Sequence, residues 1–296
     1  MKKLPLPIAG LMLGLAGLGN LLASHWIGFR YIAGLLSFLI GVMLIVQIAG
    51  DFAGFKKQMK NPVIASVFPT FSMAFMILAG YISKWQGFAK FIWYLAIGLH
   101  IILMVFFTKN HLMHLKIENV YAGYFIVYVG ICVASLTAPA FDNLALGQAI
   151  FYFSFLALIV FLGLVGYRYA TNRKIDEGLR PLFSIFAAPT SLCLAGYVAS
   201  FPEGSKNFAL FLTIMSQAIF FFVIIRGFSL FKLAFYPSFS AFTFPFVISS
   251  IGLKTANGKY FQSPLLKTLV LLETIFVTIM VIRVFLGYVN FLRKDK

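Results

Sequence analysis

Ten apolar segments, each close to the length that crosses a membrane as a helix, dominate this 296-residue chain. They lie at about residues 6–24, 29–50, 62–83, 87–108, 119–138, 145–168, 181–200, 207–230, 238–253 and 264–287. Hydrophobic residues make up 61% of the chain and charged residues only 11%, which excludes an ordinary soluble domain. None of the segments alternates polar and apolar residues as the strands of a membrane barrel do. The sequence therefore predicts an all-α integral membrane protein with ten transmembrane helices.

The starts of the odd-numbered segments recur at nearly constant intervals. Pro5, Pro62, Asn119, Pro181 and Pro237 are 56 to 62 residues apart, and each interval holds two apolar segments joined by a short loop. An internal repeat of this kind determines the architecture of a chain. We therefore predict one transmembrane domain, residues 1–296, made of five tandem helical hairpins that form a ring around a central pore. The predicted hairpins span about residues 5–50, 62–108, 119–168, 181–230 and 237–287.

Residues that interrupt helices are concentrated in the odd-numbered segments. Pro69, Pro189 and Pro245 each lie about two turns after the start of their segment, where proline removes a backbone hydrogen bond and kinks the helix. The first segment carries Gly10 and Gly14, and the fifth carries Gly130. Irregular backbone at membrane depth is tolerated only against protein or a water-filled cavity. We expect the odd-numbered helices to line the pore, although such residues also help helices to pack closely.

Lysine and arginine are distributed unequally between the two sides of the membrane. With a cytoplasmic N-terminus, 16 of the 24 basic residues lie on the inner side, seven on the outer side, and Arg283 inside the last span. The positive-inside rule then places both termini in the cytoplasm and predicts a multi-pass protein of a bacterial-type cytoplasmic membrane. The net charge of +16 follows largely from this topology and suits anionic lipid, so it requires no nucleic acid.

Catalytic and metal-binding patterns are missing from the sequence. No nucleophile, zinc or phosphate-loop motif is present, so we expect neither an enzyme nor a cofactor. His111 and His114 form an H-x-x-H pair without a third ligand, and a solvated loop is the favoured interpretation. Cys132 and Cys193 fall inside spans, as small packing residues do. Glu273 is the acidic residue well inside a span, which makes it the candidate for ion coupling.

Three motifs resemble one family of membrane proteins. "PIAGLMLGLAGLGNL" at residues 7–21, "NPVIASVFPTFSM" at 61–73 and "SAFTFPFVISSIGL" at 240–253 are similar to the tellurite-resistance and dicarboxylate transporter family. That family includes bacterial TehA-type channels and plant guard-cell slow anion channels. The resemblance implies ten helices as five hairpins, a homotrimer, glycines at Gly10 and Gly14 that line the first pore helix, and a phenylalanine that occludes the pore. The aromatic-Thr-Phe-Pro pattern places this gate at Phe244. Phe68 precedes Pro69 in the same way and is the second gate candidate.

We therefore predict an anion channel or facilitator with weak selectivity, whose positive mouth includes Lys60, Arg180 and Arg226. The alternative is a secondary transporter of a small anion, such as a C4-dicarboxylate, sulfite or a tellurite-type oxyanion, coupled to protons through Glu273. A membrane scaffold that conducts nothing is the third interpretation.

Overall fold

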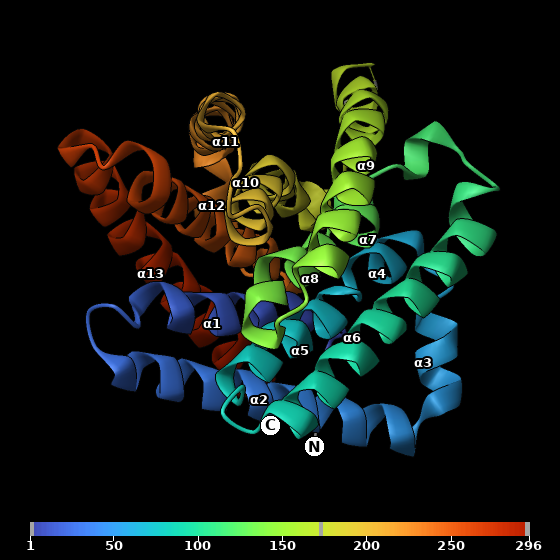
Figure 1. Ribbon diagram of the computed structural model, residues 1–296. Coiled ribbons are helices and arrows are strands. Elements are labelled where there is room, and N and C mark those ends of the chain that lie inside the picture. Colours follow the sequence, from blue (N-terminus) through green and yellow to red (C-terminus); the bar gives the residue numbers. More distant parts are fainter. Residues whose placement is uncertain (1–2, 172–173, 294–296) are drawn as a thin grey trace.

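The computed structural model describes residues 3–171 and 174–293, and its regular structure within these ranges is helical throughout (Figure 1). Eight helical segments among the described residues are long and apolar enough to cross a membrane. Two shorter apolar helices, Ile8–Leu22 and Cys132–Phe141, lie in the first and fifth predicted spans. The chain is thus a helical integral membrane protein. Lys2, Arg173, Lys294 and Lys296, which the charge count includes, lie outside the described residues.

Each even-numbered span is one continuous helix on the periphery of the molecule (Figure 1). These outer helices are α2 (Ile27–Gly50), α6 (Gln86–Phe107), α9 (Leu144–Thr171), α11 (Lys206–Gly227) and α13 (Pro264–Arg293). In their most apolar stretches only 33–39% of the residues are buried. Large apolar side chains on their free faces are exposed, as helices in contact with lipid require.

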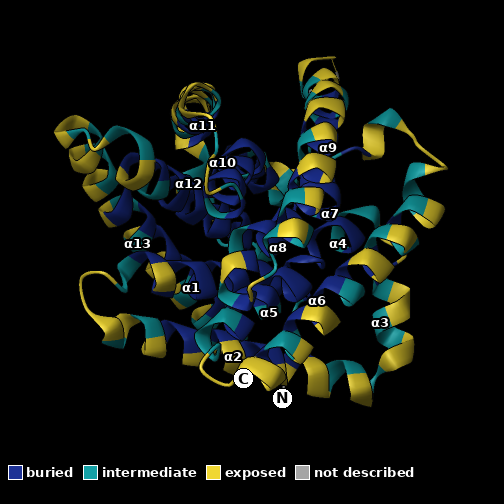
Figure 2. Ribbon diagram, viewed as in Figure 1, coloured by how far each residue is buried: buried dark blue, intermediate teal, exposed yellow. Residues whose placement is uncertain are grey.

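The odd-numbered spans form the centre, and four of the five are divided into two shorter helices. The first span is α1 (Ile8–Leu22), which is continuous, and the others pair α4 (Pro62–Val67) with α5 (Thr70–Tyr81), α7 (Gly123–Tyr128) with α8 (Cys132–Thr137), η4 (Glu177–Ala187) with α10 (Ala188–Ser200), and η6 (Pro237–Phe242) with α12 (Phe244–Ala256). In the third, seventh and ninth spans 78–83% of the most apolar stretch is buried. Figure 2 shows these inner helices mostly in the colour of buried residues.

The inner prolines explain three of the four divisions. Pro69 is the N-cap of α5, while Pro189 and Pro245 occupy the first turns of α10 and α12. The sequence predicts kinks at these positions, and the structure goes further, because a new helix starts at each proline. Proline lacks an N–H and has a fixed φ, so it fits the first turn of a helix and disrupts a later one.

A glycine divides the fifth span, which has no proline at the corresponding place. The N–H of Gly130 donates to the carbonyl oxygen of Phe125 at 3.1 Å, five residues back, where a regular helix would bond four residues back. A Cβ atom at residue 130 would lie 2.1 Å from the carbonyl oxygen of Ile126. Only glycine therefore fits this break without displacement of the chain.

The main helices of the inner spans contact one another in a closed cycle. α1 contacts α5, α5 contacts α8, α8 contacts α10, α10 contacts α12, and α12 contacts α1 again. Each of these helices also packs against the outer helix that follows it in the chain. The elements that connect or end the spans are α3 (Phe52–Gln58), η1 (Thr108–Leu112), η2 (Ile117–Asn119), η3 (Ala138–Phe141), η5 (Phe228–Lys232) and η7 (Asn257–Phe261).

Candidate functional site

A small cavity lies where the divided inner spans meet. Its volume is about 40 Å³, and every one of the five inner spans contributes to its wall. One lining residue from each span is Gly10, Met73, Gly130, Pro189 and Phe244. The wall carries no charged side chain from the described part of the chain. A space of this size holds one or two waters at most, so the cavity is narrow and largely apolar.

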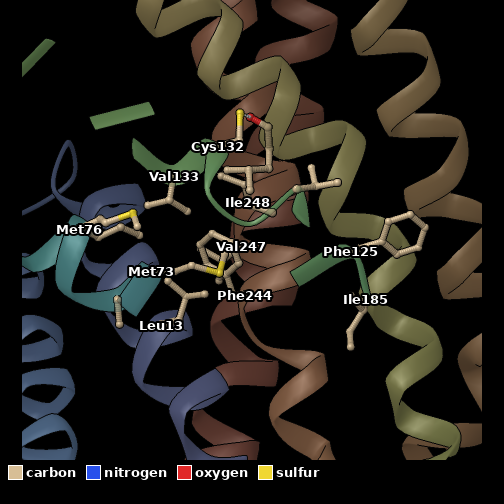
Figure 3. Close-up of a cluster of buried hydrophobic side chains, with 14 of the residues drawn as sticks. Leu13, Met73, Met76, Phe125, Cys132, Val133, Ile185, Phe244, Val247 and Ile248 are labelled. Carbon is tan, nitrogen blue, oxygen red and sulfur yellow. Dashed lines mark hydrogen bonds between the residues drawn. The ribbon is translucent and has the colours of Figure 1, made fainter. Parts of the chain in front are cut away.

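Phe244 lies at the wall of this cavity as the first residue of α12. Its side chain is 3% exposed, and a Cβ atom built on Gly17 of α1 would lie 3.3 Å from the ring. Figure 3 shows the ring together with Met73 of α5 and Val247 of α12 in one apolar cluster. Gly10 and Leu13 of α1 line the cavity, whereas Gly17 lines a second hollow at the C-terminal end of α1. Phe244 thus lines the cavity and packs near a residue of the second hollow.

The backbone beside Phe244 is fixed against α1 by a close contact. Thr243 Oγ1 lies 2.9 Å from the carbonyl oxygen of Gly10 and 2.6 Å from that of Ser240, and it can donate to either. A Cβ atom on Gly14 would lie 2.5 Å from the Cβ of Thr243. Gly14, which was expected to line the pore, is therefore the surface on which Thr243 packs, and it does not line the cavity. Gly10 has both roles, since a Cβ there would lie 2.9 Å from the Cβ of Ser240.

The remaining predicted pore residues divide into two groups. Gly130, Pro189 and Pro245 line the cavity, each at the break of its span. Pro69 starts α5 beside the cavity without lining it. Phe68 is equally buried but lies elsewhere: its ring stacks on Phe71 with centroids 5.4 Å apart and meets the edge of Phe55 at 5.1 Å.

The second hollow has a volume of about 360 Å³, and we call it the outer vestibule because it lies on the side that the sequence predicts to face out of the cell. Its wall comes from the outer ends of α1, α5, α8 and α12, from η3, and from the first turn of α2. Two cations line it, Arg30 and Lys254, and no described carboxylate does. The sequence placed the positive mouth elsewhere: Lys60, Arg180 and Arg226 are exposed and line neither space. The position of Arg30 and Lys254 at the outer ends of their spans was the signal that could have identified them.

Glu273 is buried on α13, away from both spaces. Its side chain is 3% exposed and lies near Ser250 of α12 and Gln217 of α11. Neither carboxyl oxygen makes a hydrogen bond of ordinary geometry with any described residue. Glu273 lines neither the cavity nor the vestibule. The structure therefore separates the candidate coupling residue from the candidate pore.

A buried histidine that the sequence did not single out links three helices. His100 of α6 is fully buried; its Nδ1 lies 2.9 Å from Ser72 Oγ of α5, and its Nε2 donates to the carbonyl oxygen of Val127 of α7 at 3.1 Å. Ser72 Oγ also lies 2.8 Å from the carbonyl oxygen of Pro69, beside the break in the third span. His100 thus joins an outer helix to two divided inner spans. Its position in an apolar run was the available signal.

The two other sites considered from the sequence are structural. His111 is half-buried in η1, where a solvated loop was expected, and its Nε2 donates to the carbonyl oxygen of Met59 at 3.2 Å, whereas His114 is exposed. In the described ranges no group of three or more histidine, cysteine or acidic residues is placed to hold a metal ion. Cys132 and Cys193 are free and buried, on the inner helices α8 and α10. Both therefore pack within the core, as the sequence predicts.

Divided helices that enclose a narrow space, surrounded by continuous apolar helices, are typical of membrane channels and transporters. The family model described as voltage-dependent anion channel, SLAC1, matches residues 3–289, and the chain belongs to this family. The resemblance seen in the three sequence motifs is thereby confirmed. Its function is accordingly of the anion channel or transporter type. No curated protein matches the sequence.

Proposed function

We propose that the protein is an anion channel or facilitator whose pore follows the axis of a ring formed by the five inner spans. The observation that carries this proposal is the position of Phe244. Phe244 lines the central cavity, its ring lies against Gly17 of the vestibule wall, and Met73 and Val247 belong to the same cluster. An apolar constriction of this kind blocks ions because it excludes the water that would solvate them. Movement of one ring would connect the two spaces.

The walls of the proposed pore favour weak selectivity among anions. An ion pays a large desolvation cost in an apolar medium, and a hydrated passage avoids that cost without a tight binding site. The polar side chains of the central cavity are hydroxyls, Thr70 and Ser240, and neither the cavity nor the vestibule has a described carboxylate in its wall. Positive potential at the vestibule then discriminates anions from cations and does little to separate one anion from another.

The carrier alternative depends on Glu273, and its location gives that alternative less support. A proton-coupling carboxyl group must exchange protons with the pathway or with the substrate. Glu273 lies behind α12, in contact with neither space. We expect Glu273→Gln to leave anion flux unchanged, with no change in its dependence on pH. A reversal potential that follows pH in the wild type and loses this dependence in Glu273→Gln would favour the carrier.

Phe244→Ala tests the gate directly. We expect a several-fold increase in anion flux in proteoliposomes, or in current across planar bilayers, because the substitution removes the ring between the two spaces. Phe68→Ala is the matched control, since both phenylalanines are 3% exposed and precede a proline. Monodispersity and melting temperature would establish that both variants fold. Equal flux in the wild type and Phe244→Ala, or an equal increase in Phe68→Ala, would contradict the proposed gate.

The orientation and assembly are also part of this proposal. The distribution of basic residues supports cytoplasmic termini in a bacterial-type cytoplasmic membrane. The homotrimer implied by the family resemblance remains a prediction, which the mass of the detergent-solubilised protein would test.

A further inference from the structure

The outer vestibule contains positive charge that no described carboxylate neutralises. Arg30 projects from the first turn of α2 and Lys254 from the last turn of α12. Across the described ranges the one ion pair is that of Lys3 with Asp51, which belongs to the opposite, inner side. Two half-buried cations without counterions, beside a hollow of 360 Å³, raise the local concentration of anions.

Arg30 is held rigidly and retains unused hydrogen-bonding capacity. One guanidinium nitrogen donates to the carbonyl oxygen of Gly80 at 2.9 Å, and the guanidinium lies 4.6 Å from the centre of the Tyr81 ring. Its Nε is buried and has no hydrogen-bond partner among the described residues. This enclosed Nε lies out of reach of an ion in the vestibule, but a guanidinium has five N–H donors, and those of its terminal nitrogens that Gly80 does not engage remain for an acceptor there.

Lys254 is fixed from the other side of the vestibule. Its Nζ donates to the carbonyl oxygen of Leu21 at 2.8 Å and to Ser24 Oγ at 2.6 Å, at the end of α1. An ammonium group has three donors, so one remains after these two bonds. Both partners are neutral, and the full positive charge of Lys254 remains beside the hollow. Asn20, Thr137 and Thr255 complete the polar part of the wall.

We propose that the outer vestibule is an anion-binding site in which Arg30 and Lys254 hold one small inorganic anion, such as nitrate or chloride, with part of its hydration shell. The inference rests on the proposed channel function for its role, as the outer waiting position of an anion before or after it passes Phe244. The binding itself requires only the two cations and the hollow. The volume leaves room for several waters besides the ion, which keeps binding weak enough for release.

Two measurements with nitrate test this site. The first is flux through the Phe244→Ala pore as a function of external nitrate, with Arg30→Gln or Lys254→Gln added. Loss of one of the two charges that line the vestibule is expected to raise the half-saturating nitrate concentration by about five-fold. The second is the melting temperature of the detergent-solubilised protein when potassium nitrate replaces potassium gluconate at constant ionic strength. A bound ion stabilises the fold, so nitrate should raise the melting temperature of the wild type by a few degrees, and by less in either variant.

The controls separate this site from general surface charge and from the gate. Lys84→Gln removes an exposed lysine on the same side of the membrane that does not line the vestibule, and it should change neither measurement. Arg30→Lys and Lys254→Arg retain the charge and should behave nearly as the wild type in both measurements. They provide the comparison if the glutamine variants fold poorly. The site would be overturned if Arg30→Gln and Lys254→Gln left the half-saturating nitrate concentration of the Phe244→Ala pore unchanged. It would also be overturned if Lys84→Gln raised that concentration equally. Either result would leave the pore proposal intact. If no variant conducts, the pore proposal fails. The melting temperature in nitrate then still tests the anion site, because stabilisation by nitrate should depend on Arg30 and Lys254.

Discussion

Gly14→Ala is the sharpest test of how Phe244 is held in place. Gly14 lies on α1 directly opposite Thr243, the residue before the proposed gate. An added Cβ atom would lie 2.5 Å from Thr243 Cβ and 2.6 Å from Thr243 Oγ1. Non-bonded carbon atoms prefer a separation of about 3.5–4.0 Å, so α1 and the start of α12 must separate by about 1 Å. The backbone of Phe244 must move as well, because its N atom would lie 3.2 Å from the new methyl group.

The expected cost follows from this overlap. Extra methyl groups in a packed interior destabilise proteins by about 1–3 kcal/mol. The contact between Thr243 Oγ1 and the Gly10 carbonyl oxygen, 2.9 Å long, lengthens as well, but the hydroxyl can then donate to the Ser240 carbonyl oxygen at 2.6 Å, so this change adds little. A loss of this size lowers the melting temperature by roughly 3–10 °C for a protein of this size. Because the displaced segment carries Phe244, anion flux should also rise, though by less than in Phe244→Ala.

The matched control is Gly98→Ala on the outer helix α6. A Cβ atom at residue 98 would meet no atom within 4 Å, and alanine favours a helix by about 1 kcal/mol over glycine. Gly98→Ala should therefore keep or raise the melting temperature and leave the flux unchanged. Thermal unfolding in detergent and flux in proteoliposomes measure both quantities on the same preparations. If Gly14→Ala melts as high as Gly98→Ala and conducts as the wild type does, the close contact between α1 and Thr243 does not hold the gate.

Two further predictions concern parts of the fold away from the gate. His100→Ala removes both hydrogen bonds that link α6 to α5 and α7, and it should lower the free energy of unfolding by about 2–4 kcal/mol. His114→Ala, at an exposed position, should change the melting temperature little. Equal melting temperatures of the two variants would refute the structural role of His100. Hydrogen bonds from Lys3 and from the N–H of Gly54 hold the pKa of Asp51 below its ordinary value of 3.8. The ionised carboxylate therefore stabilises the fold at pH values above 3.8. This contribution is lost as the pH falls through the lowered pKa. Asp51→Asn should therefore melt below the wild type near neutral pH by a small margin, which closes in acid; a margin that does not change with pH would show that the pair contributes nothing through ionisation.

The repeat was readable from the sequence because its physical causes are local. Proline at the start of a helix and again two turns later marks both halves of a divided span, and Pro62 and Pro237 mark two of the starts. Pro181 was expected to mark a third, but η4 begins at Glu177 and contains Pro181 in its interior. Apolar runs likewise located the outer helices to within a few residues, apart from α13, which continues to Arg293. The division of the fifth span at Gly130 was less visible. A glycine break depends on neighbouring atoms, here the carbonyl oxygen of Ile126, and spacing alone does not reveal those atoms.

The site was readable only in part, because long-range contacts determine the rest. The position of Phe244 came from a local motif together with the family resemblance. The basic vestibule depends on Arg30 and Lys254, which are 224 positions apart in the chain and meet only when the first and fifth hairpins pack together. From the sequence alone, both are cations near loops, and the predicted topology accounts for them without any site. Phe68 and Phe244 show the converse, since similar local patterns place one ring in an aromatic cluster with Phe55 and the other at the cavity.

The divided inner spans have an electrostatic consequence that involves no side chain. α5, α10 and α12 all begin at the wall of the central cavity and run outward from it, at Thr70, Ala188 and Phe244. The amino end of a helix is the positive end of its dipole, equivalent to about half an elementary charge. Three such ends converge on one apolar space. The carboxyl ends of α4, η4 and η6 meet them at the same breaks with the opposite polarity, so the two sets of helix ends offset each other. The cavity wall is therefore neutral in side-chain charge and without a strong backbone field, a combination that lets an ion pass without trapping it.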